Sequence, residues 1–231
     1  MPHVSALCFW LAVVLTGVPA AAAELSDTIR PEQLDEPLLA RAIFAETNRV
    51  RVQLGLKVFR AEPKLDDAAD TQARMGAVFR PPSHTNPFPL IATPLDRVKF
   101  AGLDPELVAE NIAQISIYDV PSGVSIYYLK NDRTLRDARD GQPVRTHTYA
   151  SFAQAIVQAW MNSPGHRENI MNAKLSFLGC AAKISRSQDD IPMIFAVQAF
   201  FTPKKAAAAK SSLPSAAPTR HESGRSLRRI P

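Results

Sequence analysis

Apolar residues recur at intervals of three and four positions in three long segments, which predicts three amphipathic helices. The first covers residues 38–54 and is followed by Gly55, a residue that readily adopts the left-handed conformation in which helices end. The second covers residues 63–79, opens with a proline and is followed by two more prolines. The third covers residues 148–163, opens with capping hydroxyl residues and stops at Pro164-Gly165.

Shorter patterns predict the remaining elements. Residues 93–102 begin with a threonine and a proline and end in glycine, which indicates a short helix. Residues 110–117 alternate as in a strand, and residues 177–184 and 191–201 are predicted to form an antiparallel hairpin. Residues 118–147 mix proline, glycine and opposite charges and are expected to be a loop or hairpin insertion. Helices mixed with a small, late sheet indicate the α+β class.

The amino terminus has the composition of a secretory signal peptide. The first 23 residues contain no charged side chain, residues 4–18 are largely apolar, and Ala21 and Ala23 form a small-residue cleavage pattern. We expect cleavage before Glu24 and export to the periplasm or the extracellular space; the alternative is an uncleaved anchor. Residues 24–37 would then form an N-terminal extension.

Cysteine content excludes a disulfide-based scaffold. Cleavage of the signal peptide removes Cys8, so Cys180 is the one thiol of the mature chain and has no intramolecular partner. Because Cys180 lies in an apolar run that resembles a strand, we expect its side chain to be buried.

Positive charge is concentrated at the carboxyl terminus. The net charge is +5, but residues 204–231 hold seven basic residues and one acidic residue, so the remainder of the chain carries −1. A nucleic-acid partner is therefore not expected for the folded part. Residues 204–231 are rich in alanine, serine and proline and are predicted to be a disordered basic tail, with an anionic envelope surface as its expected partner.

Several short motifs occur in an order that is typical of one family. Ser83-His84 is followed by Ala109-Glu110-Asn111-Ile112-Ala113, and later by Trp160-Met161-Asn162-Ser163-Pro164-Gly165-His166-Arg167. With these motifs the chain resembles the CAP superfamily, also called SCP-like domains. The resemblance covers about residues 38–202, and the domain is expected to span residues 38–203. Further matching segments are Asn48-Arg49, Gly55-Leu56, Asn169-Ile170-Met171, Leu178-Gly179-Cys180 and Val197-Gln198-Ala199-Phe200.

The resemblance implies a three-layer α-β-α sandwich with a small antiparallel sheet and a cleft where two histidines and two acidic residues meet. His84, Glu110 and His166 match the first histidine, the first glutamate and the second histidine. The position of the second glutamate is occupied by other residues, so the acidic set is incomplete. The residues found there are Met161, Asn162 and Ser163.

Two functions follow from this set of side chains. The first is an exported, non-enzymatic binding module in which His84, Glu110 and His166 hold a small ligand, a lipid or an envelope component. The alternative is a peptidase-like hydrolase in which the three residues hold a divalent metal such as zinc and Glu110 accepts a proton from metal-bound water. The sequence establishes no cofactor, and the metal is the one expected candidate.

Overall fold

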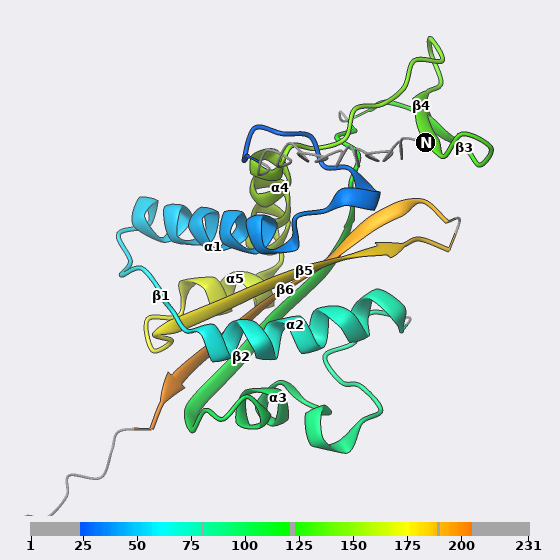
Figure 1. Ribbon diagram of the computed structural model, residues 1–231. Coiled ribbons are helices and arrows are strands. Elements are labelled where there is room, and N and C mark those ends of the chain that lie inside the picture. The colour runs from blue at the N-terminus through cyan, green and yellow to red at the C-terminus, as the bar shows by residue number, and fades with distance from the viewer. Residues whose placement is uncertain (1–23, 80, 121–122, 189, 205–231) are drawn as a thin grey trace, which may run out of the picture.

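A four-stranded sheet lies between two layers of helices (Figure 1). The computed structural model describes residues 24–79, 81–120, 123–188 and 190–204. The strand order is β1-β5-β6-β2; β1 runs parallel to β5 and the other neighbours are antiparallel. These layers confirm the expected α+β class. The strands are β1 (Arg60–Ala61), β2 (Pro105–Ser116), β5 (Phe177–Arg186) and β6 (Pro192–Pro203).

Helices cover both faces of the sheet. Figure 1 shows α1 and α4 on one side and α2 and α3 on the other, with α5 behind the strands on the side of α4. Within the described residues, no helix has both the length and the apolar character needed to cross a bilayer. The helices are α1 (Glu36–Gln53), α2 (Pro63–Val78), α3 (Pro94–Phe100), α4 (Tyr149–Asn162) and α5 (Pro164–Met171), with short turns η1 (Pro31–Gln33) and η2 (Pro89–Ile91).

Alternation along the strands divides the apolar core into two halves. Leu178 and Cys180 of β5 pack into the half formed with α1 and α4, whereas Ala181 packs into the half formed with α2. Phe195 of β6 joins Ala181 in the second half. Successive side chains of a strand point to opposite faces, so the central strands supply both halves. The burial expected for Cys180 is confirmed, with 3% of its surface exposed.

Side-chain caps explain where the helices begin. Helix α1 begins at Glu36, two residues earlier than the apolar pattern predicts. The Asp35 carboxylate accepts a hydrogen bond from the backbone N–H of Leu38 in its first turn. Thr93 and Asp96 form a reciprocal capping box on α3, and Thr148 and Ser151 form another on α4. Each box satisfies backbone N–H groups that have no partner inside the helix.

The predicted N-terminal extension is part of the folded structure. Ile29 is 1% exposed in the core, and the backbone N–H of Asp35 donates to the Tyr149 hydroxyl at 2.8 Å. Residues 24–37 therefore pack against the start of α4. The predicted signal peptide (1–23) and residues 205–231 of the predicted tail lie outside the described residues.

The predicted insertion at 118–147 contains a two-stranded hairpin, β3 (Ile126–Leu129) and β4 (Thr134–Asp137). Leu135 of β4 is 2% exposed and joins the core on the α4 side of the sheet. The hairpin is thus anchored to the domain through β4.

One helix was not expected from the sequence. The third predicted helix ends as expected before Pro164, but Pro164 also lies in the first turn of α5. A proline ends a preceding helix because it lacks an N–H, and the first turn of the next helix does not need that N–H. The same residue therefore separates two helices, and α5 carries His166.

We predict that Gly179→Ala destabilises the fold, because a Cβ atom at this position would lie 2.4 Å from the backbone carbon of Leu65 in α2. Moving α2 away from β5 should cost about 1–3 kcal/mol in free energy of unfolding, measured by urea denaturation. The matched control is Gly165→Ala, where a Cβ atom meets nothing within 4 Å. Equal stabilities of the two variants would contradict this account of the packing.

Candidate functional site

Glu110 lies on β2, an edge strand of the sheet. Its side chain is 2% exposed and faces the α3 side. Residues two apart on a strand share a face, and Ile112 packs in the core formed with α2 and α3. Asn111 points to the opposite face, toward α5. Two adjacent residues of one edge strand therefore connect to different helical layers.

Arg97 of α3 pairs with this buried carboxylate. Its Nη2 atom lies 2.6 Å from Oε2 of Glu110, and its side chain is 1% exposed. The same guanidinium donates to the carbonyl of His84 at 3.1 Å and to the carbonyl of Ile91 at 3.0 Å. A guanidinium has several donors in one plane, so Arg97 links the loop between α2 and α3 to the sheet.

His84 closes the other side of the carboxylate. Its Nδ1 atom lies 2.9 Å from Oε1 of Glu110, and 48% of its side chain is exposed. The loop is also held by Gln72 of α2, whose amide donates to the carbonyl of Ser83 at 2.6 Å. Both oxygens of Glu110 are therefore engaged, one by Arg97 and the other by His84.

His166 approaches from α5. Burial lowers the pKa of His166, and the nearby His84 lowers it further, so the imidazole is neutral at neutral pH. The backbone carbonyl of His166 accepts a hydrogen bond from Asn111, the residue that follows Glu110, so His166 lies at the same edge of the sheet. The structure thus brings the side chains of His84 and Glu110 into direct contact and His166 to the strand that carries Glu110.

Asparagine side chains fix α5 against the edge of β2. Asn111 donates to the carbonyl of His166 at 3.1 Å, and Asn169 donates to Oδ1 of Asn111 at 2.8 Å and to the carbonyl of Glu110 at 3.3 Å. The buried network continues from Asn111 to Gln198 of β6 and from Gln198 to Thr47 of α1. His166 is consequently held by a chain of polar contacts that crosses the sheet.

The three predicted metal ligands do not form a metal-binding group. Across the described ranges of the chain, no three histidine, cysteine, aspartate or glutamate side chains are arranged to hold a metal ion. Glu110 already makes a hydrogen bond at each oxygen, and the positive charge of Arg97 disfavours a cation beside it. The metal role expected for His84, Glu110 and His166 stays a prediction, and so does their role in binding another ligand.

Arg97 was missed by sequence reasoning. Its partners Glu110 and His84 are each 13 residues away, and a charged residue in a short helix is normally solvent-exposed. The one available signal in the sequence was the position of Arg97 next to an apolar residue, Val98, which the structure shows to be buried. That pattern does not identify an ion pair.

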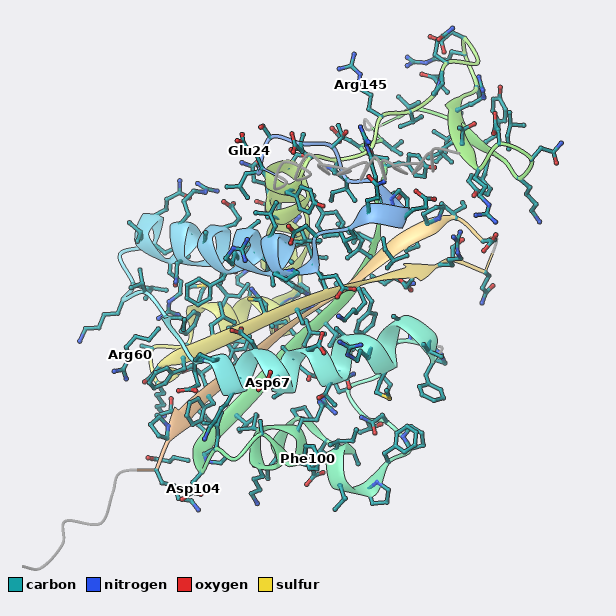
Figure 2. All side chains as sticks on the ribbon, in the orientation of Figure 1. Glu24, Arg60, Asp67, Phe100, Asp104 and Arg145 are labelled. Carbon is teal, nitrogen blue, oxygen red and sulfur yellow. The ribbon has the colours of Figure 1, made fainter. Side chains whose placement is uncertain are left out.

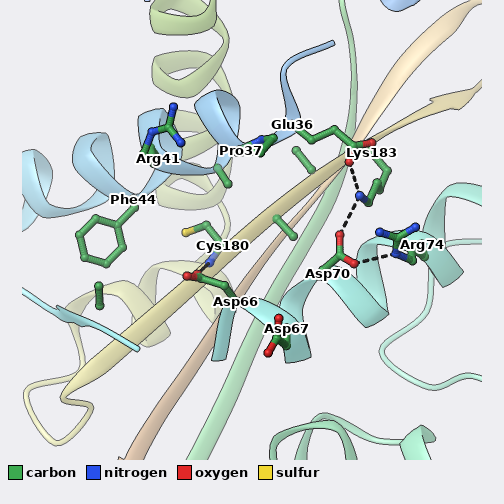
Figure 3. Close-up of a pocket in the computed structure, with 14 residues that line it drawn as sticks. Glu36, Pro37, Arg41, Phe44, Asp66, Asp67, Asp70, Arg74, Cys180 and Lys183 are labelled. Carbon is green, nitrogen blue, oxygen red and sulfur yellow. Dashed lines mark hydrogen bonds and ion pairs between the residues drawn. The ribbon is translucent and has the colours of Figure 1, made fainter. Parts of the chain in front are cut away.

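A groove lies at the opposite edge of the sheet (Figure 3). Because β1 is only two residues long, β5 has no neighbouring strand beyond Leu178, and the groove runs there between α1 and α2. Its volume is about 740 Å³. Phe44 and Ala40 line the α1 wall, and Asp66 of the α2 wall accepts a hydrogen bond from the backbone N–H of Cys180 at 3.0 Å.

A cluster of charged residues lines part of the groove. Lys183 of β5 pairs with Glu36 of α1 and, at 2.7 Å, with Asp70 of α2, as Figure 3 shows. Burial raises the pKa of Asp70, but the hydrogen bonds from Lys183 and Arg74 outweigh it, so the pKa lies below its ordinary value. The cluster therefore joins helices from both layers across the edge of β5.

We predict that Arg97→Met lowers the free energy of unfolding by about 3–5 kcal/mol, because it leaves Glu110 buried without its cationic partner. Urea denaturation measures this change. Adding Glu110→Gln to Arg97→Met should recover part of the loss, because the uncompensated charge is then gone. The control is Lys204→Ala, which removes an ion pair with Asp104 whose side chains are 59% and 72% exposed, and should leave the denaturation midpoint nearly unchanged.

We predict that His84→Asn raises the pKa of His166 toward its ordinary value of 6.5, because one of the two causes that lower it is removed. NMR titration of the imidazole resonances measures this shift. His147 is the internal control, since burial lowers its pKa and Asp119 is its other charged neighbour. An unchanged pKa of His166 in the variant would contradict the proximity of the two histidines.

Comparison with known proteins identifies the family. The model of the family described as "CAP: Cysteine-rich secretory protein family" matches residues 44–200. No protein among those with curated descriptions matches the chain.

Solved structures similar to the chain include an extracellular protein containing an SCP domain from Bacillus anthracis, at 21% identity and a TM-score of 0.49. That match covers 76% of this chain and 45% of the other, so this chain spans less than half of that protein's length. An outer surface protein from Borrelia burgdorferi is similar at 19% identity and a TM-score of 0.48, with 74% of this chain and 97% of the other covered. Because the family model covers more than half of the sequence, the chain belongs to the cysteine-rich secretory protein (CAP) family.

Proposed function

We propose that the protein is an exported CAP-family binding module without catalytic activity, in which the site of His84, Glu110 and His166 binds a small polar ligand or envelope component through its two imidazoles. Export rests on the apolar pattern of residues 1–23, which indicates a signal peptide and a periplasmic or extracellular location. Relatives described as an extracellular protein and an outer surface protein agree with export.

The observation that carries the proposal is that each carboxylate oxygen of Glu110 already has a hydrogen-bond partner within the protein. A general base needs a carboxylate oxygen that can take a proton from substrate or water, but Arg97 and His84 occupy both oxygens. The groups that remain for a ligand are the imidazoles of His84, which is largely exposed, and His166. This arrangement supports binding by hydrogen bonds and does not support the hydrolase alternative.

The charge balance of the site selects the kind of ligand. Arg97 and Glu110 neutralise each other, and the lowered pKa of His166 keeps that imidazole uncharged. A neutral imidazole offers one donor and one acceptor. The site therefore suits a neutral or anionic ligand with hydroxyl, carbonyl or carboxylate groups, and it disfavours a cation.

A lipid is the second candidate ligand, and the groove between α1 and α2 favours it. Phe44, Ala40 and Ala61 give part of this groove an apolar lining beside its charged residues, and its volume of about 740 Å³ lies within the range of small-molecule sites. The groove and the histidine pair lie at opposite edges of the sheet, so variants of one leave the other intact.

The test is a titration of the mature protein with envelope saccharide fragments and with a sixteen-carbon fatty acid, followed by NMR. A polar ligand should shift the resonances of His84 and His166 and bind at least tenfold more weakly to His84→Ala, with the groove variant Phe44→Ser as matched control. Loss of fatty-acid binding in Phe44→Ser alone would assign the lipid to the groove. Retention of every polar ligand by His84→Ala would overturn the histidine site.

A further inference from the structure

One strand of the insertion has an open edge. β3 pairs with β4 on one side, and among the described residues no other strand pairs with β3 on its other side. The far side of β4 is covered: the backbone N–H of Val144 donates to the carbonyl of Leu135 at 2.7 Å, and that of Asp137 donates to Gln142 at 3.0 Å. Figure 1 shows the hairpin at the margin of the molecule, apart from the four-stranded sheet. The open edge of this small sheet is therefore the outer edge of β3.

The hydrogen bonds of the hairpin show which backbone groups of β3 face outward. The N–H of Ala138 donates to the carbonyl of Ser125 at 2.8 Å, so the backbone of Ser125 faces the β4 side. The two directions alternate along an antiparallel strand, so the backbone of Tyr127 also faces β4. Ile126 and Tyr128 therefore turn their N–H and C=O groups outward.

The side chains of β3 add an exposed, uncharged surface to this edge. Ile126, Tyr127 and Leu129 are 41%, 42% and 38% exposed. Edge strands that stay unpaired commonly carry charged residues or proline, and β3 carries neither. The charged residues of the insertion lie on neighbouring segments instead, as with Arg145, which Figure 2 shows directed outward on the segment that leads to α4. The composition of β3 thus favours pairing with a further strand.

The two edges of the four-stranded sheet are not open in this way. At the edge of β5, the N–H of Cys180 already donates to Asp66, and Ala182, whose backbone faces the same way, is 1% exposed. At the edge of β2, the Asn169 amide donates to the carbonyl of Glu110 at 3.3 Å. Side chains from the helices therefore occupy both of these edges, whereas the edge of β3 is left exposed.

The hairpin is held rigidly enough to present this edge. Leu135 is 2% exposed in the core, and Tyr128 packs against the same core cluster. The Tyr118 hydroxyl donates to the carbonyl of Arg133, in the turn between β3 and β4, at 2.9 Å. Because the strand is already ordered, pairing at its edge carries little further cost in conformational entropy.

We propose that β3 pairs antiparallel with β3 of a second copy of this chain, which joins the two hairpins into one continuous sheet. A two-fold axis at Tyr127 places Ile126 of each copy opposite Tyr128 of the other. Residues opposite each other in a hydrogen-bonded pair exchange two hydrogen bonds, so the two pairs form four. This register uses every outward backbone group of β3.

The sequence of the strand favours a second copy as the occupant. In this register Tyr127 lies opposite Tyr127 of the other copy, and paired aromatic side chains stabilise neighbouring strands. The two Lys130 side chains lie at opposite ends of the ladder, about 20 Å apart, so their repulsion is screened. A two-fold contact between identical surfaces is also the commonest symmetry of soluble oligomers.

The dimer is expected to be weak and reversible, because the paired segment is only four residues long. It would carry two copies of the histidine site. The dimer proposal does not depend on the ligand proposal, since none of the residues of β3 belongs to that site or to the groove.

Sedimentation equilibrium of the mature full-length protein over rising concentrations tests the association. The unchanged protein should form a reversible dimer, and Tyr127→Lys should weaken it at least tenfold, because two ammonium groups then lie opposite each other. The matched control, Val52→Lys, replaces an apolar side chain that is 61% exposed on α1 and should dimerise like the unchanged protein. A protein that is monomeric at every concentration, or equal dimerisation of the Tyr127 variant, would overturn the proposal.

Cysteine substitutions test the register. Opposite residues of a non-hydrogen-bonded pair lie about 4.5 Å apart at Cα, within the reach of a disulfide. Tyr127→Cys should therefore give a covalent dimer on mild oxidation. Leu129→Cys alone should not, but mixed with Ser125→Cys, its expected opposite residue, it should cross-link. Cys180 is 3% exposed and should give no covalent dimer of the unchanged protein. Failure of Tyr127→Cys to cross-link, or equal cross-linking by Leu129→Cys alone, would overturn this pairing.

Discussion

The buried ion pair of Arg97 and Glu110 is the interaction on which this end of the molecule depends. A carboxylate with 2% exposure is costly to bury unless a cation and further hydrogen bonds compensate it, and Arg97 supplies the cation. The same guanidinium binds backbone carbonyls of the loop, so the pair orders the segment that carries His84. One interaction therefore sets the charge of the site and the position of its most exposed side chain.

The helices of this fold were largely predictable from sequence because their signals are local. Asp35, Thr93 and Thr148 cap helices within one turn, and apolar spacing reports the buried face directly. The strands near the carboxyl terminus were recognisable for the same reason. Helix α5 escaped prediction because Pro164 gives the same signal for an ending and for a beginning.

The candidate site was predictable only in part, because its geometry depends on residues that are distant in sequence. The resemblance to the CAP superfamily selected His84, Glu110 and His166, and the structure brings His84 into contact with Glu110. The resemblance did not indicate Arg97, whose guanidinium places a positive charge beside Glu110. A family pattern records which side chains recur, whereas the charge at a site depends on every neighbour that the chain brings there.

The positions of the groove and the histidine pair have a consequence for how this domain is used. They lie at opposite edges of one sheet, with β5 and β6 between them. Two molecules held at these edges would not collide, so a single copy has room to act as a bridge between them. The two edges use different side chains, so the two surfaces can diverge separately while the sheet between them is preserved.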